Sequence, residues 1–189
     1  SLKYVIFGSF ASGLMLFGFS LLYGLTGALN IYEIHAILVS TDNVSAILFS
    51  IILILVGFGY KISMVPFHYW TPDVYEGAPT TITAFLSVAP KAAGFALFLR
   101  FFSYVFTEDG SFAGIAPLLS INWPFLLAIL SAATMTVGNI LALRQENVKR
   151  MLAYSTISHV GFMLMAVCTL TSIAINGVLF YILMYTFMN

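Results

Sequence analysis

Long apolar runs, separated by short polar segments, follow one another along almost the whole chain. A helix that crosses ~30 Å of hydrocarbon needs about 20 mostly apolar residues at 1.5 Å of rise per residue. Runs of this length predict membrane-spanning segments over residues 3–25, 45–75, 80–104, 123–143, 148–170 and, incompletely, 172–189. The pattern therefore predicts an all-α integral membrane protein, a polytopic helix bundle forming a single transmembrane domain over residues 1–189.

Prolines interrupt two of these predicted spans. Pro66 has no N–H to donate to the carbonyl of Ile62, so a helix that runs through it loses a hydrogen bond and bends. We expect the second span to break at Pro66 and to continue as a half-helix over residues 67–75. Pro90 lies inside the third span, where a second helix break is predicted for the same reason.

Composition agrees with a lipid-embedded chain. Hydrophobic residues make up 61% and charged residues 7% of the sequence, whereas soluble domains carry charges at about a quarter of their positions. The absence of any basic block gives no indication of nucleic-acid binding. The single cysteine, Cys168, excludes a disulfide framework and a cysteine-ligated iron–sulfur cluster in the sequence. Both ends of the sequence look cut, so we expect a fragment of a longer membrane protein.

Two lysines within the predicted spans are the leading candidates for chemistry. Lys61 follows a long apolar run and Lys91 lies near the middle of its span. A cation at membrane depth costs ~2.5–3.5 kcal/mol on insertion scales and commonly marks an ion path. The alternative is a lysine that extends its amine to the headgroups. Because all carboxylates in the sequence fall in predicted loops or turns, an ionic partner for Lys61 is expected from outside this stretch.

Two histidines and a third lysine are weaker candidates. His68 follows Pro66, and His159 shares a helix face with Ser155, which suggests an imidazole–hydroxyl relay. For each histidine, a proton relay and a purely structural hydrogen bond stay open. Lys3, at the start of the first span, is interpreted from its position as an interfacial anchor.

Other polar residues are given structural interpretations. We expect His35 to be a solvated loop residue, Asp73 and Glu76 to serve as caps or turn residues, and Asn139 to bond across helices. Residues 114–122 are predicted to lie along the interface. The link over residues 144–150 holds three of the seven Lys and Arg residues, which places it on the cytoplasmic side by the positive-inside rule.

Three segments of the sequence carry a family resemblance. They read GYKISMVPFHYWTPDVYEGAPT, SVAPKAAGFALFLRFF and GNILALRQENVKRMLAYSTISHVGF. Together they resemble the antiporter-like membrane subunits of respiratory complex I, and the N-type subunits above all. The resemblance implies an inverted-repeat antiporter-like fold, of which this chain would be a fragment.

The resemblance also implies roles for particular residues. It assigns the broken-helix lysine to Lys61, the neighbouring central lysine to Lys91 and a further lysine of the path to Lys3. The histidines of the family pattern fall on His68 and His159. The glutamate partner of the broken-helix lysine would lie before Ser1.

The function implied is proton translocation, as a subunit of an NADH:quinone oxidoreductase. No cofactor is expected in this chain, while NADH, flavin, iron–sulfur clusters and quinone are expected in partner subunits. The implied partners are other membrane subunits of complex I and the lipid bilayer. The bacterial inner membrane is the favoured location, with thylakoid and mitochondrial inner membranes as alternatives. A sodium/proton antiporter subunit and a non-conducting scaffold remain the alternative functions.

Overall fold

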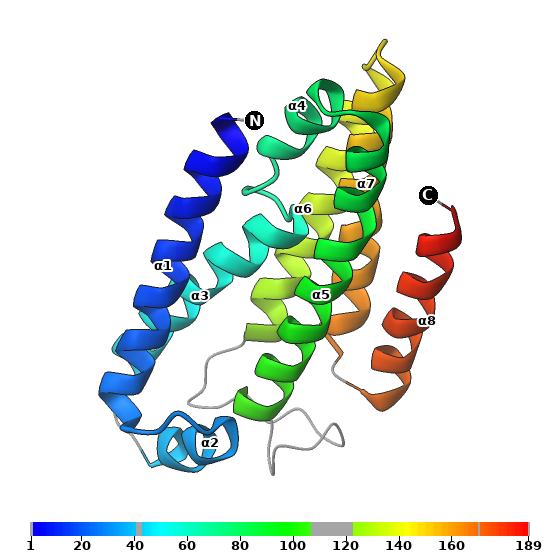
Figure 1. The fold of residues 1–189 in the computed structure, drawn as a ribbon. Coiled ribbons are helices and arrows are strands. Elements are labelled where there is room, and N and C mark those ends of the chain that lie inside the picture. Colours follow the sequence, from blue (N-terminus) through cyan, green and yellow to red (C-terminus); the bar gives the residue numbers. More distant parts are fainter. Residues whose placement is uncertain (1, 41–42, 107–122, 170, 189) are drawn as a thin grey trace.

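The computed structural model describes residues 2–40, 43–106, 123–169 and 171–188. Within these ranges, regular secondary structure is helical throughout (Figure 1). The helices are α1 (Leu2–Thr26), α2 (Ile31–Val39), α3 (Val44–Ile62), α4 (Trp70–Gly77), α5 (Thr80–Phe106), α6 (Trp123–Leu143), α7 (Val148–Val167) and α8 (Ser172–Met188).

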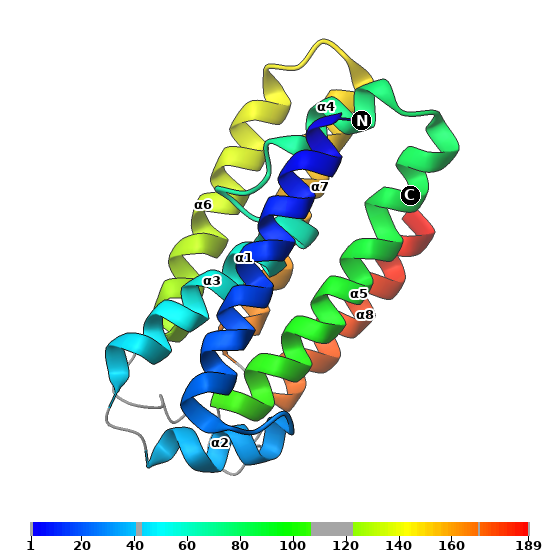
Figure 2. The ribbon, with the colours of Figure 1, turned by 60° about the vertical axis from the view of Figure 1, so that its left-hand side comes forward.

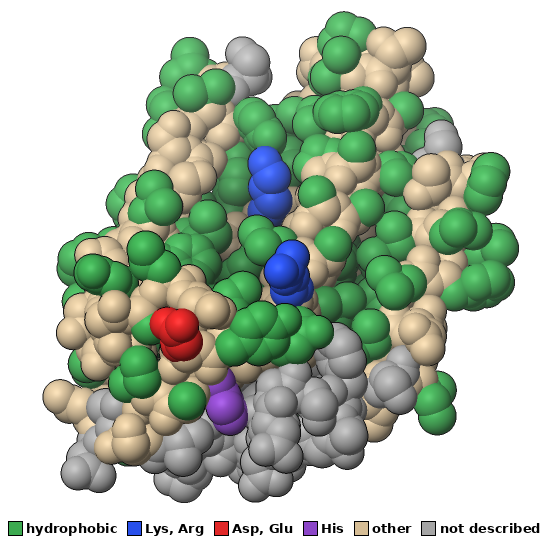
Figure 3. All heavy atoms as spheres, turned by 60° about the horizontal axis from the view of Figure 1, so that its bottom comes forward, with side chains coloured by type: hydrophobic (Ala, Val, Ile, Leu, Met, Phe, Trp, Pro, Cys, Tyr) green, Lys and Arg blue, Asp and Glu red, His purple; other side chains and the backbone are tan. Residues whose placement is uncertain are grey.

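Among the described residues, α1, α3, α5 and α6 are long and apolar enough to cross a membrane. The 20 residues of α7 include Lys149, Arg150 and His159, and α8 is an apolar helix of 17 residues. Hydrophobic side chains are spread over the described part of the face in Figure 3, among backbone and other side chains, and charged groups there are few and isolated. Such a surface suits lipid, and the all-helical membrane fold predicted from the sequence is confirmed. The predicted number of spans remains a prediction.

The long helices lie lengthwise along the bundle, and α2 lies across one end of it (Figures 1 and 2). The most extensive contacts join α6 with α7 and α1 with α3. Glycine at position 18 allows α1 to lie close to α3, because a Cβ at Gly18 of α1 would lie 2.9 Å from the backbone oxygen of Ser50 in α3. The predicted interfacial segment over residues 114–122 lies outside the described residues.

The helix containing Lys61 is broken, but the break begins before Pro66. Helix α3 ends at Ile62, and Ser63 adopts a left-handed conformation with φ 66°. The amide of Met64 donates to the carbonyl of Gly59 at 2.8 Å, and that of Ser63 donates to Tyr60 at 3.2 Å. This pattern of paired bonds is a helix C-terminal motif that stops a helix by satisfying its last carbonyls. The predicted break point at Pro66 and the predicted start of the half-helix at residue 67 were therefore wrong by several residues.

Side chains from neighbouring segments satisfy the groups around the break. Trp70 Nε1 donates to the carbonyl of Tyr60 at 3.0 Å. The hydroxyl of Thr71 donates to that of Ser63 at 2.7 Å. From α6, Thr134 Oγ1 accepts the amide of Val65 at 3.1 Å. The irregular backbone is thus held inside protein, as non-helical backbone at membrane depth requires.

A substitution at Thr134 tests this account of the break. Thr134→Val keeps the shape of the side chain but removes the acceptor for Val65 N–H, which should cost about 1–3 kcal/mol of stability. Thr136→Val is the matched control, since exposed Thr136 on the same helix bonds only to the carbonyl of Ala132 in its own helix. Thermal unfolding in detergent should separate the two variants, and equal melting temperatures would contradict the role given to Thr134.

Pro90 does not break its helix. Helix α5 continues from Thr80 to Phe106 with Pro90 inside it. A proline in a helix interior removes one backbone hydrogen bond, but neighbouring helices in a membrane bundle can tolerate that loss. The helix break predicted at Pro90 was wrong.

Candidate functional site

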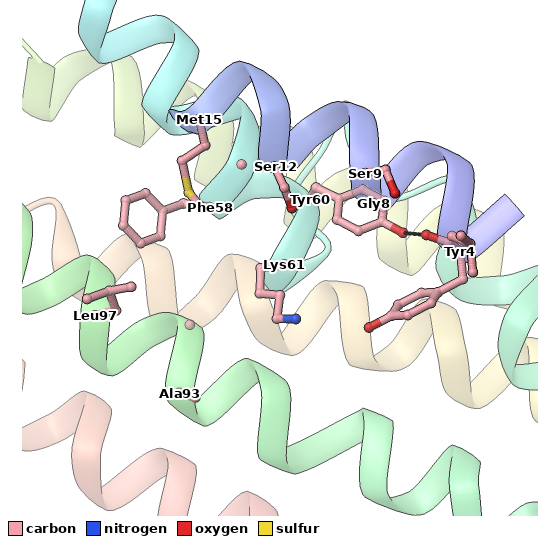
Figure 4. Close-up of a pocket in the computed structure, with 13 residues that line it drawn as sticks. Tyr4, Gly8, Ser9, Ser12, Met15, Phe58, Tyr60, Lys61, Ala93 and Leu97 are labelled. Carbon is pink, nitrogen blue, oxygen red and sulfur yellow. Dashed lines mark hydrogen bonds between the residues drawn. The ribbon is translucent and has the colours of Figure 1, made fainter. Parts of the chain in front are cut away.

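A cleft with a volume of about 550 Å³ opens beside the break in α3. Three helices line it, and the amine of Lys61 reaches into it from α3 (Figure 4). Helix α1 contributes small side chains at Gly8, Ser9 and Ser12, and α5 contributes Gly94. A Cβ at Gly94 would lie 2.8 Å from Ile62 Cγ2, so glycine allows α5 to pass close to the end of α3.

Lys61 is exposed to this cleft rather than buried. Within the described part of the chain, no carboxylate lies within 4.0 Å of its amine. The described part of the chain therefore does not enclose Lys61. The expectation that its acidic partner comes from elsewhere remains a prediction.

Lys91, in contrast, is enclosed, with 2% of its surface exposed. Its amine has no hydrogen-bond partner among the described residues. The amine lies 5.4 Å from the centre of the Tyr75 ring, within the range of a cation–π contact. Tyr75 itself is 1% exposed, and its hydroxyl is also unpartnered within the described residues. An enclosed amine on an aromatic face is a group that can hold a proton without a permanent counter-ion.

The two candidate histidines lie in different elements of the structure. His68 is buried in the turn between α3 and α4, and its ring stacks on that of Tyr69 at 4.5 Å. His159 lies on α7. Its Nδ1 shares a hydrogen bond of 2.6 Å with the hydroxyl of Tyr181 in α8. The partner predicted for His159 was Ser155, so the structure assigns the hydroxyl to a different helix.

Lys3 belongs to an ion-pair cluster at the end of the bundle where α1 and α7 begin. Its amine bonds to Asp73 of α4, which also accepts from Arg150 Nη1 at 2.7 Å. The same Arg150 nitrogen donates to Glu76 at 2.9 Å. The interpretation of Asp73 and Glu76 as simple cap and turn residues missed these pairs. Only the three-residue spacing of the two carboxylates, which puts them on one helix face, pointed to a shared partner.

Two further expectations can be compared with the structure. His35 lies on α2, half-buried, with Nδ1 3.0 Å from the carbonyl of Val105, so the solvated-loop interpretation was wrong. Asn139 accepts a hydrogen bond of 3.0 Å from Ser158 across α6 and α7, as expected.

The cluster predicts a pH dependence. Asp73 lies outside the four membrane-length helices, and hydrogen bonds from Lys3 first and Arg150 second hold the pKa of its carboxyl below its usual value. Because the pKa of Asp73 is lower in the folded than in the unfolded protein, its ionised carboxylate stabilises the fold, and this stabilisation is fully present above the ordinary carboxyl pKa of about 4. The stabilisation is lost as the pH falls through the lower pKa of the folded state. We therefore expect the attachment of α4 to weaken over this acidic pH range. Amide hydrogen exchange in α4 measures the change. Asp73→Asn should remove the dependence, and an unchanged acid response in that variant would contradict the assignment.

The fold and site define a class: polytopic helical membrane proteins with a lysine at a broken helix and an enclosed lysine on the next long helix. The family model for the transmembrane part of the NADH:quinone oxidoreductase and Mrp antiporter proteins matches residues 1–189. The chain belongs to this family and is an integral membrane protein.

Curated relatives agree with this assignment. The chain is 51% identical to NADH-quinone oxidoreductase subunit N 2 of Chloroherpeton thalassium over 190 residues, covering 100% of this chain and 36% of that protein. It is 52% identical to the subunit of the same name from Sorangium cellulosum over 195 residues, covering 100% and 38%. The chain therefore spans well under half the length of these relatives.

Solved structures share the fold, and they come from multi-subunit membrane complexes. Respiratory complex I from Thermus thermophilus with bound aureothin matches with a TM-score of 0.73 and 35% identity, over 96% of this chain and 37% of that chain. The Mrp complex from Dietzia sp. matches with a TM-score of 0.80 and 26% identity, over 97% and 32%.

Proposed function

We propose that this chain is part of a proton-translocating membrane subunit of an NADH:quinone oxidoreductase. The observation that carries the proposal is the pair of amines: Lys61 at a broken helix beside an open cleft, and Lys91 enclosed on the next long helix. Intramembrane amines of this kind are retained where protons or ions move. The names of the curated relatives support the same activity.

In the proposed mechanism, Lys61 takes up and releases a proton as an acidic group approaches or withdraws across the cleft. A nearby carboxylate favours the ammonium, and its withdrawal favours the neutral amine. Such a group would have to come from outside the described residues, and the 550 Å³ cleft offers room for it or for water. The small side chains of α1 leave that space open.

Lys91 is the next residue in the proposed proton path. The Tyr75 ring stabilises its charged form, while the lack of a fixed acceptor among the described residues leaves the proton free to move on. His159, with Tyr181, continues the path on the α7 side, and His68 lies at the break itself. Lys3 takes part through Asp73 at the end of the bundle.

The energy would come from redox chemistry elsewhere in the complex. NADH, flavin, iron–sulfur clusters and quinone are assigned to partner subunits, and the partners in direct contact are other membrane subunits and lipid. The bacterial inner membrane is the proposed location, because both curated relatives quoted above are bacterial.

Replacing Lys61 tests this function. Lys61→Ala should lower proton translocation in the intact complex, reconstituted in vesicles, while the complex still assembles, because the exposed amine contributes little to packing. Lys61→Arg, which keeps a charge but does not readily lose its proton, should be defective too. Normal pumping by a fully assembled Lys61→Ala complex would refute the proposal. A failure to assemble in both variants would instead favour a non-conducting scaffold.

A sodium/proton antiporter subunit is the second candidate, since the Mrp complex of Dietzia sp. shares the fold over 97% of this chain. The two functions differ in their driving force. Sodium-dependent proton transport in the absence of NADH would favour the antiporter, whereas transport that requires NADH oxidation would favour the oxidoreductase subunit.

A further inference from the structure

Helix α4 is attached to the start of α7 by a set of polar contacts. Arg150 Nη1 lies 2.7 Å from Asp73 Oδ1 and 2.9 Å from Glu76 Oε2, and its Nε donates to Gln145 at 3.2 Å. One guanidinium therefore connects both carboxylates of α4 to α7. The second oxygen of Asp73 takes the amine of Lys3, which attaches α4 to α1 as well.

Two neighbours of Arg150 strengthen this attachment. Asn147, the N-cap of α7, donates from Nδ2 to Glu76 at 3.2 Å. Lys149 Nζ donates to the carbonyl of Ala78, immediately after the end of α4, at 2.9 Å. Three polar residues at the start of α7 thus hold both the polar face and the end of α4.

Helix α4 depends on such contacts because it is short. It has eight residues, fewer than an isolated helix needs to be stable. Asp73 and Glu76 form its polar face, while Tyr75 is buried on the side that meets Lys91. Any rotation of α4 that releases the carboxylates must also move the Tyr75 ring.

We propose that Arg150 is a positioning residue, which sets the rotation of α4 through Asp73 and Glu76 and thereby holds the Tyr75 ring against Lys91. The inference rests on the proposed function only where it concerns proton transfer at Lys91. The role of Arg150 in holding α4 does not depend on the proposed function. The inference assigns a role in the proposed proton path to a residue that the sequence alone marks only as part of a basic link.

The test compares Arg150→Gln with Arg144→Gln in the intact complex. Arg144 is the matched control, because it lies in the same basic link, is exposed, and its side chain forms no hydrogen bond or ion pair with the described residues. Amide hydrogen exchange over α4 should become about fivefold faster in Arg150→Gln, within the range that a partly exposed ion-pair network supports. Arg144→Gln should exchange as the unmodified protein does.

Proton pumping is the second readout. Arg150→Gln should lower the protons moved per NADH oxidised and change the pH profile of pumping, and Arg150→Lys should restore part of both. Faster α4 exchange with an unchanged pH profile and unchanged pumping would show a merely structural contact and overturn the inference. Unchanged exchange in Arg150→Gln would overturn it as well.

The exchange measurement keeps the two proposals distinguishable. If Lys61 and Lys91 variants pump normally, the proposed function fails, while α4 exchange still decides whether Arg150 holds this helix. Should Arg150→Gln fail to assemble, Glu76→Gln removes one of the two guanidinium contacts with less disturbance. Unchanged α4 exchange in that variant would contradict the inference in the same way.

Discussion

Replacing Lys91 with methionine should lower the proposed proton translocation through this chain by about a hundredfold while leaving the helix bundle folded. The side chains have similar length, but methionine cannot hold a proton. Positioned proton-transfer groups contribute about 10²–10⁴-fold to the steps they serve, so a loss of about a hundredfold is expected for transfer at this site. Proton uptake by vesicles containing the intact complex, driven by NADH, measures it.

Although its proton transport is reduced, the Lys91→Met variant should be as stable as the unmodified protein or more stable. Lys91 is 2% exposed and its amine has no hydrogen-bond partner among the described residues, so the folded protein bears the desolvation cost of that group. Replacing buried charges by hydrophobic groups of similar volume is often neutral or stabilising by 1–4 kcal/mol. A higher or equal melting temperature with lost pumping would separate a transport role from a scaffold role. Lower stability with normal pumping would contradict the expectation, and Arg144→Met controls for removal of a cation.

The sequence predicted the class of fold because the apolar runs are long and charges are few. It also predicted the broken helix, but not the point of the break. Pro66 explains why a helix cannot continue through it, whereas the helix already ends at Ile62, and the residue that follows, Ser63, is left-handed although it is not glycine. The segment after the helix is held by partners far along the chain, including Thr134 of α6, which accepts a hydrogen bond from the amide of Val65. A single residue's local preference cannot report such contacts.

The candidate site was only partly predictable for a similar reason. An amine inside an apolar run is visible in the sequence, and so Lys61 and Lys91 could be singled out. The difference between them, one open to a cleft and one enclosed on Tyr75, depends on how α1, α3, α4 and α5 pack. The contacts of Arg150 with Asp73 and Glu76 cross more than 70 positions of sequence and could not be predicted from spacing.

Gly138, in the interface of α6 and α7, should not tolerate a side chain. A Cβ there would lie 2.7 Å from the backbone nitrogen of Ser158 and 3.0 Å from the carbonyl oxygen of Tyr154. Both are backbone atoms, which cannot rotate away, so the two helices would have to separate. Gly138→Ala should therefore lower stability by about 1–3 kcal/mol, as overpacking typically does. Thermal unfolding in detergent measures this loss.

The same separation of α6 from α7 should disturb the proposed proton path. Asn139 and Ser158 share a hydrogen bond of 3.0 Å across this interface, and His159 follows Ser158 directly.

Gly177→Ala is the matched control, because a Cβ at Gly177 of α8 meets no described atom within 4 Å. That variant should be neutral or gain up to ~1 kcal/mol, the helix-propensity difference between alanine and glycine. Equal stability of the two alanine variants would show that close approach at Gly138 does not hold α6 against α7.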